Sequence, residues 1–202
     1  MHNAVPDALK AAGIADEEFF THAGTLSAGA RRELCAILTT RVLDRPAIGS
    51  GPARSIPRKG TVTLTTHRWS VQLPAEFGHA DITPELARLV RQSGLRDGVL
   101  TVQMLGSTGA ITTIEYESGA LSDLRQALDL LAPAEAEYAH NVRWGDGNGF
   151  SHVRSALLKT SLSLPVVDGE LILGTWQQVV AINLDNRERQ RELVAVIVGS
   201  GP

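Results

Sequence analysis

The segment that most constrains the fold is "SLSLPVVDGELILGT", residues 161–175, in which two apolar runs flank Asp168 and Gly169. An Asp-Gly pair tolerates the positive φ angles that a two-residue turn between antiparallel strands requires. The pattern therefore predicts a β-hairpin with strands over 162–167 and 170–175. A chain that contains this hairpin must build at least part of an antiparallel sheet.

Other segments also have the alternation of strands. In "TVTLTTHRWSVQLP", which begins at Thr61, the apolar phase changes near His67, so we expect a long strand with a bulge, or two strands joined by a tight bend. Strands are also predicted over 99–105 and 110–116. The closing run "ELVAVIVG" has no charge from Leu193 onward, so it should lie centrally in the sheet or at a subunit contact, where its edge is covered.

Two or three helices interrupt these strands. Thr83 is a candidate N-cap, Pro84 suits the first helical position, and Gly94 suits the end of the helix. Its expected buried stripe consists of Leu86, Leu89 and Val90. Further helices are predicted over 122–132 and 151–158. The fold class that follows is α+β, with a largely antiparallel sheet and two to three inserted helices.

The N-terminal part differs in character. Residues 1–45 have helical, loosely amphipathic spacing, and "DRPAIGSGPARSIPRKG", residues 44–60, is rich in proline and glycine as linkers are. We therefore predict a helical N-terminal extension and linker over 1–50 and an α+β domain over 51–202.

Composition excludes several classes of function. A chain of 202 residues that is 43% hydrophobic can bury a full core, and its net charge of −3 gives no basic field for nucleic acid. The lone Cys35 permits no intrachain disulfide and no cysteine-based zinc site. No apolar run reaches membrane-spanning length. We expect a cytoplasmic protein with neither a nucleic-acid nor a membrane partner.

The candidate chemistry centres on His140 and His152, which flank the glycine-rich loop "GDGNG", residues 145–149. If the loop folds back, the two imidazoles can share a polar pocket for a metal or a phosphate. The alternative is two half-buried histidines, each bonded to the backbone. The loop itself could offer N–H groups to an anion ahead of a helix starting at Ser151, or be a plain glycine loop.

The arginines of the last turn and Trp176 are two further features with structural or functional interpretations. The arginines at 187, 189 and 191 could grip a phosphate, although the solvated tip of a hairpin is the more usual place for such residues. Trp176, a large aromatic side chain in an aliphatic strand, is predicted to be buried and to anchor the hairpin. On that basis Trp176→Ala would cost about 3–5 kcal/mol.

Residues 161–179 also match a family signature: a serine, an apolar strand, a turn glycine, then Gly-Thr-Trp-Gln and an apolar residue. In this respect the chain resembles the YjbQ-like family, described as secondary thiamine-phosphate synthase enzymes. The similarity extends to "SGLRDGVLTV", residues 93–102, and "HNVRWGDGNGFSHV", residues 140–153, and covers about 56–201.

The resemblance implies an α+β fold, a homotrimer and a polar, histidine-lined pocket for a phosphorylated small molecule, with weak thiamine-phosphate synthase (transferase) activity. His140 and His152 match two family motifs and would be catalytic together with Glu115. They would also hold a divalent metal, namely Zn, Mn or Mg. The implied ligand-binding residues are Asn148, Ser151, Ser107 and Thr108.

The chain also departs from the family pattern. A third family histidine aligns with Gly106, a family asparagine aligns with Ile114, and Lys159 stands where the family usually has glycine. A three-imidazole metal site that lacks one ligand must recruit Glu115, a water or another subunit. Two hypotheses follow: a transferase of the family's kind, or a non-catalytic ligand-binding or assembly protein that retains the trimeric fold.

Overall fold

The structure is a computed structural model, and it describes residues 61–201. The helical extension and linker predicted over 1–50 lie outside these residues. Within them, none of the helices has the length and apolar character needed to cross a membrane.

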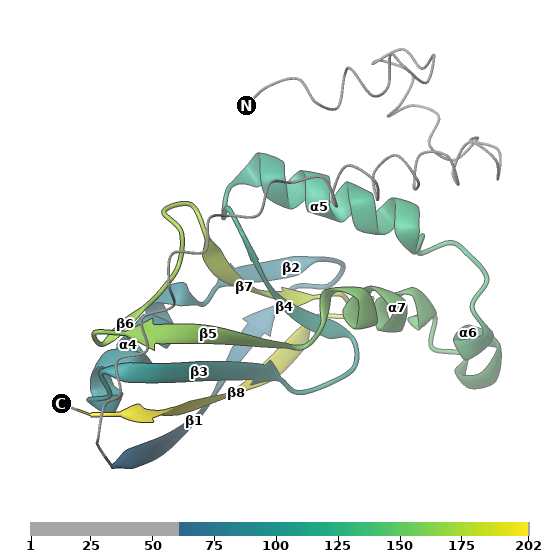
Figure 1. Cartoon of the computed structure of the whole chain (residues 1–202). Coiled ribbons are helices and arrows are strands. Elements are labelled where there is room, and N and C mark those ends of the chain that lie inside the picture. The colour runs from purple at the N-terminus through teal and green to yellow at the C-terminus, as the bar shows by residue number, and fades with distance from the viewer. Residues whose placement is uncertain (1–60, 202) are drawn as a thin grey trace, which may run out of the picture. The chain divides into compact units, whose positions relative to one another are not determined.

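The larger of two sheets has five strands in the order β1-β8-β3-β5-β6, and every neighbouring pair is antiparallel (Figure 1). The smaller sheet has the order β2-β7-β4 and is also antiparallel. The strands are β1 (Val62–Leu73), β2 (Gly78–Asp81), β3 (Asp97–Met104), β4 (Gly109–Ile114), β5 (Ser161–Val167), β6 (Glu170–Leu171), β7 (Gln178–Asn183) and β8 (Arg189–Ser200). This confirms the predicted α+β class.

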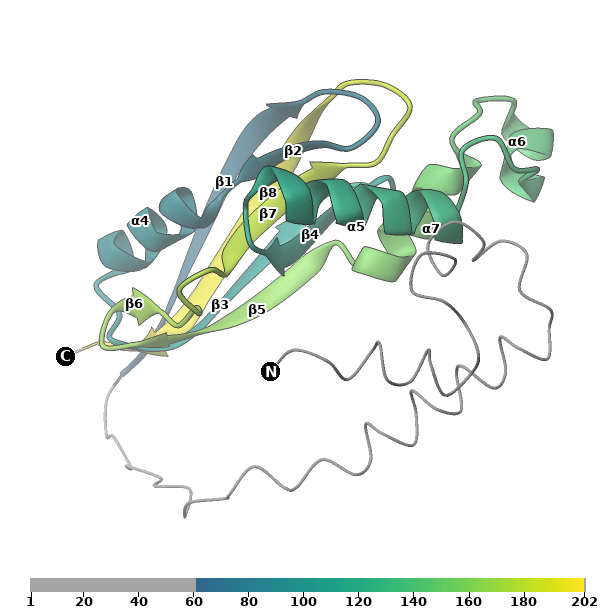
Figure 2. The same cartoon turned by 90° about the horizontal axis from the view of Figure 1, so that it is seen from above.

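Helices α4 and α5 cover these sheets, while α6 and α7 follow one another before β5. Their bounds are α4 (Thr83–Ser93), α5 (Ser118–Leu131), α6 (Ala139–Trp144) and α7 (Gly149–Leu158). Figure 2 shows α5 lying over the smaller sheet. Helix α4 has the predicted buried stripe of Leu86, Leu89 and Val90, and it ends at Gly94. The predicted cap was wrong by one residue, because Ile82 holds the N-cap position and the Thr83 hydroxyl accepts from the backbone N–H of Val179 at 2.8 Å.

The smaller sheet is a middle layer with a core on each side. On one side, Val179 and Ala181 of β7 join a cluster formed with the larger sheet and α4. On the other side, Val180 and Ile182 join a second cluster that includes Leu128 of α5. Strand β7 is therefore buried on both faces, which explains its nearly continuous apolar sequence.

Strand β8 lies between β1 and β3, so the predicted central position of the final strand is confirmed. Its core-facing side chains include Leu193, Ala195 and Ile197, all with no exposed surface. The predicted bulge or bend in the first strand is wrong, because β1 is one continuous strand paired with β8 along its length. The side chains of Val62 and Leu64 consequently fall on the opposite, exposed face.

The Asp-Gly hairpin forms as predicted, with Asp168 at φ 53° and Gly169 at φ 82°. Its second strand is shorter than expected, because β6 contains only Glu170 and Leu171. The chain then leaves the sheet, and Trp176 lies in the following loop with 70% of its surface exposed. The prediction that Trp176 is buried was therefore wrong.

This exposure changes the expected effect of Trp176→Ala. Because the indole already contacts water, we expect the free energy of unfolding to fall by less than about 1 kcal/mol, as for most surface substitutions. Chemical denaturation of the variant at the same protein concentration as the wild type measures this. A loss of about 3 kcal/mol or more would mean that the indole is packed in solution.

Candidate functional site

The glycine-rich loop folds back on itself and places α6 beside the start of α7. Helix α6 ends at Gly145, whose φ is 69°, and the side-chain oxygen of Asn141 accepts the backbone N–H of Gly149 at 2.8 Å. A side chain at Gly149 would place its Cβ 2.5 Å from the Cβ of Tyr138. Glycine at this position therefore permits the close approach that brings the two helices together.

The loop brings His140 and His152 together, with ring centroids 4.4 Å apart and ring planes tilted by 50°. Nε2 of His140 lies 3.4 Å from a carboxylate oxygen of Asp146. The buried Asn148 amide, oriented with its nitrogen toward Asp146, lies 3.2 Å from both carboxylate oxygens and from Nε2 of His140. The predicted convergence of the two imidazoles is present in the structure, and Asn148 belongs to the same group.

The carboxyl of Asp146 is held as an anion within this group. Partial desolvation raises its pKa, but the hydrogen bond and charge of His140 and the backbone N–H groups of Asn148 and Asp146 lower it by more. The pKa of Asp146 thus lies below its usual range.

A polar pocket of about 460 Å³ lies between the C-terminal half of α7 and the turn that precedes β4. Its lining residues are Gly106, Ser107, His152, Ser155, Ala156, Lys159, Thr160 and Ser161. These supply four hydroxyls, one imidazole and one ammonium group, with no carboxylate. The hydroxyl of Ser155 donates to the Gly109 carbonyl at 2.6 Å, whereas that of Thr160 accepts from Gln103 at 2.9 Å and keeps its own proton to donate.

The other predicted ligand-binding residues have different surroundings. Ser107 lines the pocket, as predicted for a ligand contact. Thr108 is buried, and its hydroxyl donates to Oδ2 of Asp185 at 2.9 Å. Ser151 has no exposed surface, and its Oγ finds no hydrogen-bond partner in the described part of the chain. Of these three, only Ser107 is positioned to touch a ligand in this pocket.

The structure does not bring Glu115 to the two histidines. Glu115 follows the last residue of β4, while Thr108 precedes the first, and six extended residues span roughly 20 Å. His152 lies at the Thr108 end, where Ser155 of the same helix bonds to Gly109. The extended strand therefore separates Glu115 from the two histidines of the same chain, and a catalytic role of Glu115 together with them stays a prediction.

The residues present do not form a complete metal site. Across residues 61–201, no group of three or more His, Cys, Asp or Glu side chains is arranged to hold a metal ion. His140 and His152 supply two imidazoles, and Asp146 is already bonded to His140. A Zn, Mn or Mg ion held by His140 and His152 would need further ligands from outside this group.

Two buried charged residues lie near the pocket: Arg191, one of three arginines that could bind a phosphate according to the sequence, and Asp185, which was not predicted as a site residue. Arg191, expected at a solvated tip, is buried at 6% exposure, and Asp185 is buried at 1%. The alternation of β8 could have revealed Arg191, because it lies two residues before the inward-facing Leu193. Asp185 had no comparable signal, since it lies in a turn where no periodicity applies.

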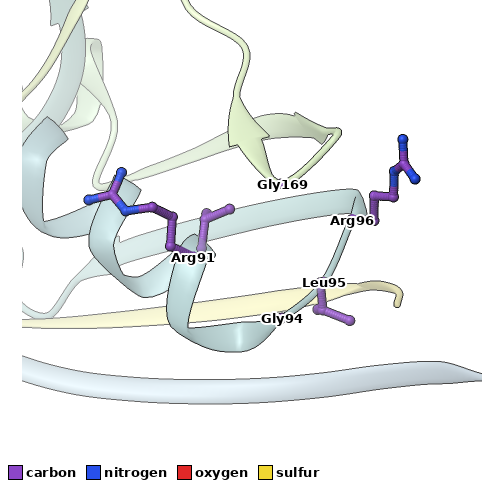
Figure 3. A pocket seen from close by; sticks show the side chains of 6 residues that line it. Arg91, Gly94, Leu95, Arg96 and Gly169 are labelled. Atoms are coloured by element: carbon purple, nitrogen blue, oxygen red, sulfur yellow. The ribbon is translucent and has the colours of Figure 1, made fainter. Parts of the chain in front are cut away.

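A second pocket, of about 320 Å³, lies where the end of α4 meets the hairpin turn. Figure 3 shows Arg91 and Arg96 extending in different directions around it. Nη2 of Arg96 lies 2.6 Å from a carboxylate oxygen of Asp168. Because one cation is paired and the two do not converge, this pocket is a weaker candidate than the one beside His152.

These features define a class: an α+β protein with two antiparallel sheets and a polar pocket beside paired histidines. The model of the family described as "UPF0047 protein YjbQ-like" matches residues 67–200, more than half of the chain. The chain therefore belongs to this family, and the resemblance inferred from its sequence is confirmed.

Relatives and solved structures agree with this assignment. A UPF0047 protein of Methanothermobacter thermautotrophicus is 40% identical over 116 residues, which are 57% of this chain and 80% of that protein. One from Archaeoglobus fulgidus is 32% identical, with 58% and 89% covered. The crystal structure of a YbjQ-like protein of unknown function from Sulfolobus solfataricus has a TM-score of 0.66 at 26% identity, covering 69% of this chain and all of that one.

Proposed function

We propose that the pocket beside His152 binds a phosphorylated small molecule. The observation that supports this most directly is Lys159, which lines the pocket with φ 76° and ψ 158°. This backbone conformation is almost restricted to glycine and costs another residue on the order of 1–3 kcal/mol. A lysine that keeps a strained backbone conformation in the wall of a pocket supports a functional role for its ammonium group.

The rest of the pocket suits an anion. His152 adds an imidazole whose ring N–H can donate a hydrogen bond. The hydroxyls of Ser107, Thr160 and Ser161 can also donate hydrogen bonds to phosphate oxygens. Among residues 61–201, no carboxylate lines the pocket to repel a negative charge. Charge-assisted hydrogen bonds from lysine and histidine to a phosphate are among the stronger contacts that a small polar site can make.

Calorimetric titration with pyrophosphate tests this proposal. We expect Lys159→Gly to weaken binding about tenfold, because a charged hydrogen bond is lost, while the unfolding midpoint stays equal or rises as the strain is relieved. Lys159→Arg is the matched control, since it keeps the charge in the same backbone position, and it should bind like the wild type within about threefold. Wild-type protein that does not bind millimolar pyrophosphate would contradict the proposal.

The finer proposal is weak thiamine-phosphate synthase activity, as the family resemblance implies. It is favoured by the contact between His140 and His152 beside the pocket, since paired imidazoles can move protons or bind a metal. The separation of Glu115 from these two histidines weakens the case for synthase activity. The assay supplies a pyrimidine pyrophosphate and a thiazole phosphate to wild type and to the His140→Ala/His152→Ala variant. A wild-type rate equal to the uncatalysed background would leave ligand binding without turnover as the function, and equal rates above that background would mean that the two histidines are not catalytic.

The same variant tests the proposed divalent metal. If His140 and His152 hold Zn, Mn or Mg, calorimetric titration of each ion should give binding to the wild type that the double variant loses. If the histidines contact phosphate directly, pyrophosphate affinity should fall in the double variant in the presence of a chelator. We favour direct contact because two imidazoles alone are too few ligands for a stable metal site.

We also propose that the protein assembles as a homotrimer, as the resemblance implies. An exposed apolar row crosses four strands of the larger sheet, on the face opposite its core. The row consists of Leu64, Val198, Val99 and Pro165, which are neighbours in the strand register. The first three expose 62%, 39% and 47% of their surface, and contiguous exposed apolar surface of this kind marks interaction sites.

A further inference from the structure

Arg191 is a buried cation whose bonds engage only part of its guanidinium group. Nε donates to the side-chain oxygen of Asn183 at 3.1 Å, and Nη2 donates to the carbonyl and the hydroxyl of Thr108 at 2.8 and 2.9 Å. Within residues 61–201, no hydrogen bond is made by Nη1. The guanidinium is thus fixed in orientation, with one nitrogen left to bind something else.

The charge of Arg191 is only partly balanced by the protein around it. The carboxylate of Asp185 lies 3.9 Å from Nη2 of Arg191, but its closer partners are Arg189 at 3.0 Å and the Thr108 hydroxyl at 2.9 Å. Two guanidinium groups therefore share one carboxylate. Burial lowers the pKa of Arg191, Asp185 raises it and Arg189 lowers it further. Arg189 keeps 43% of its side chain exposed to water, whereas the side chain of Arg191 is only 6% exposed and lies 3.9 Å from the carboxylate of Asp185. An anion close to Nη1 would therefore compensate a buried charge that has no closer carboxylate among residues 61–201.

The nitrogen without a hydrogen bond lies next to Gly106, a residue that lines the pocket. A Cβ at this position would lie 3.1 Å from Nη1 of Arg191, and Gly106 itself lines the pocket that contains His152 and Lys159. A side chain at 106 would therefore fill the space in front of Nη1, and glycine leaves it open.

We propose that Arg191 is the phosphate-anchoring residue of the pocket, binding one phosphate oxygen through Nη1 beside Gly106 while Lys159, which also lines the pocket, binds another. This inference rests on the proposed function, and it adds Arg191 to the residues that are proposed to bind the phosphate. The ligand class is a phosphate monoester or diphosphate, because two cations and several hydroxyl donors around an open pocket match its charge and its acceptors.

Pyrophosphate titration into the full chain tests the role of Arg191. We expect Arg191→Gln to weaken binding at least about tenfold, because a charged hydrogen bond in a low-dielectric site is lost. Arg187→Gln removes the same charge from an exposed residue of the preceding turn, and it should change affinity by less than about threefold. Far-ultraviolet circular dichroism and the unfolding midpoint report whether each variant is folded.

A second variant keeps the inference testable if Arg191→Gln does not fold. Gly106→Ala leaves Arg191 in place but puts a methyl group in front of Nη1, so affinity should fall at least about fivefold, the smaller loss expected of a steric block. Its control is Gly94→Ala, where φ is also positive, at 66° compared with 117° for Gly106, and where nothing lies within 4 Å of the added carbon. That control should bind like the wild type. The unfolding midpoint of Gly106→Ala reports the additional backbone strain at its position.

The outcomes separate the inference from the function on which it rests. If wild-type protein does not bind pyrophosphate, both the proposed function and the anchoring role are overturned. If it binds, and folded Arg191→Gln or Gly106→Ala binds equally well, only the role of Arg191 is overturned. Loss of binding in Lys159→Gly together with unchanged binding in Gly106→Ala would place the phosphate at the Lys159 wall alone.

Discussion

Replacing Ile197 with alanine should lower the free energy of unfolding by about 2–5 kcal/mol, a large fraction of the stability of a domain this size. Ile197 has no exposed surface and belongs to the main core cluster. Its strand lies between β1 and β3, where Ile197 pairs with Thr65 and Leu100. Because β8 is hydrogen-bonded to a strand on each side, the side chains around Ile197 can move only slightly to fill the cavity that the substitution leaves.

Chemical denaturation at a fixed protein concentration measures this loss, since assembly would make the midpoint depend on concentration. Ile172→Ala is the matched control, because it removes the same three carbons from a side chain that is 49% exposed in the loop after β6. It should cost about 1 kcal/mol or less. Similar losses in the two variants would contradict the central position of β8.

Much of the fold could be predicted because local patterns and global packing agree. The uncharged final strand predicted its own central position, and the Asp-Gly pair predicted its turn. Trp176 shows where this reasoning fails. A tryptophan next to aliphatic residues suggests a core position, but the chain leaves the sheet after Leu171, and the pattern of apolar residues alone does not show where pairing ends.

The candidate site was less predictable, because it depends on where elements are carried in space. His140 and His152 are too far apart in sequence to share a helix face, and their contact depends on a loop closed by Asn141 and Gly149. The family resemblance grouped Glu115 with the two histidines, whereas the direction of β4 carries Glu115 away from them. Arg191 was not distinguished from Arg187 and Arg189, because the charge of a residue suggests exposure, although the place of Arg191 in the strand alternation indicates burial.

Val198→Glu should convert the proposed homotrimer into single chains. Val198 lies in the middle of the exposed apolar row, flanked in the register by Leu64 and Val99. If another copy covers this face, the new carboxylate would be buried against apolar side chains without a partner, and its desolvation would cost several kcal/mol at each contact. A trimer joined by three such contacts would not form at micromolar concentration.

Light scattering during size-exclusion chromatography measures the mass of the assembly in solution directly. Wild type should have about three times the mass of the 21.6 kDa chain, and Val198→Glu about one times that mass, with an unchanged circular dichroism spectrum. Val142→Glu makes the same substitution on α6 at a side chain that is 88% exposed, so it should remain trimeric. A trimeric Val198→Glu protein would move the interface to another face. A wild type with the mass of one chain would remove the homotrimer, because exposed apolar rows would then stay uncovered at that concentration.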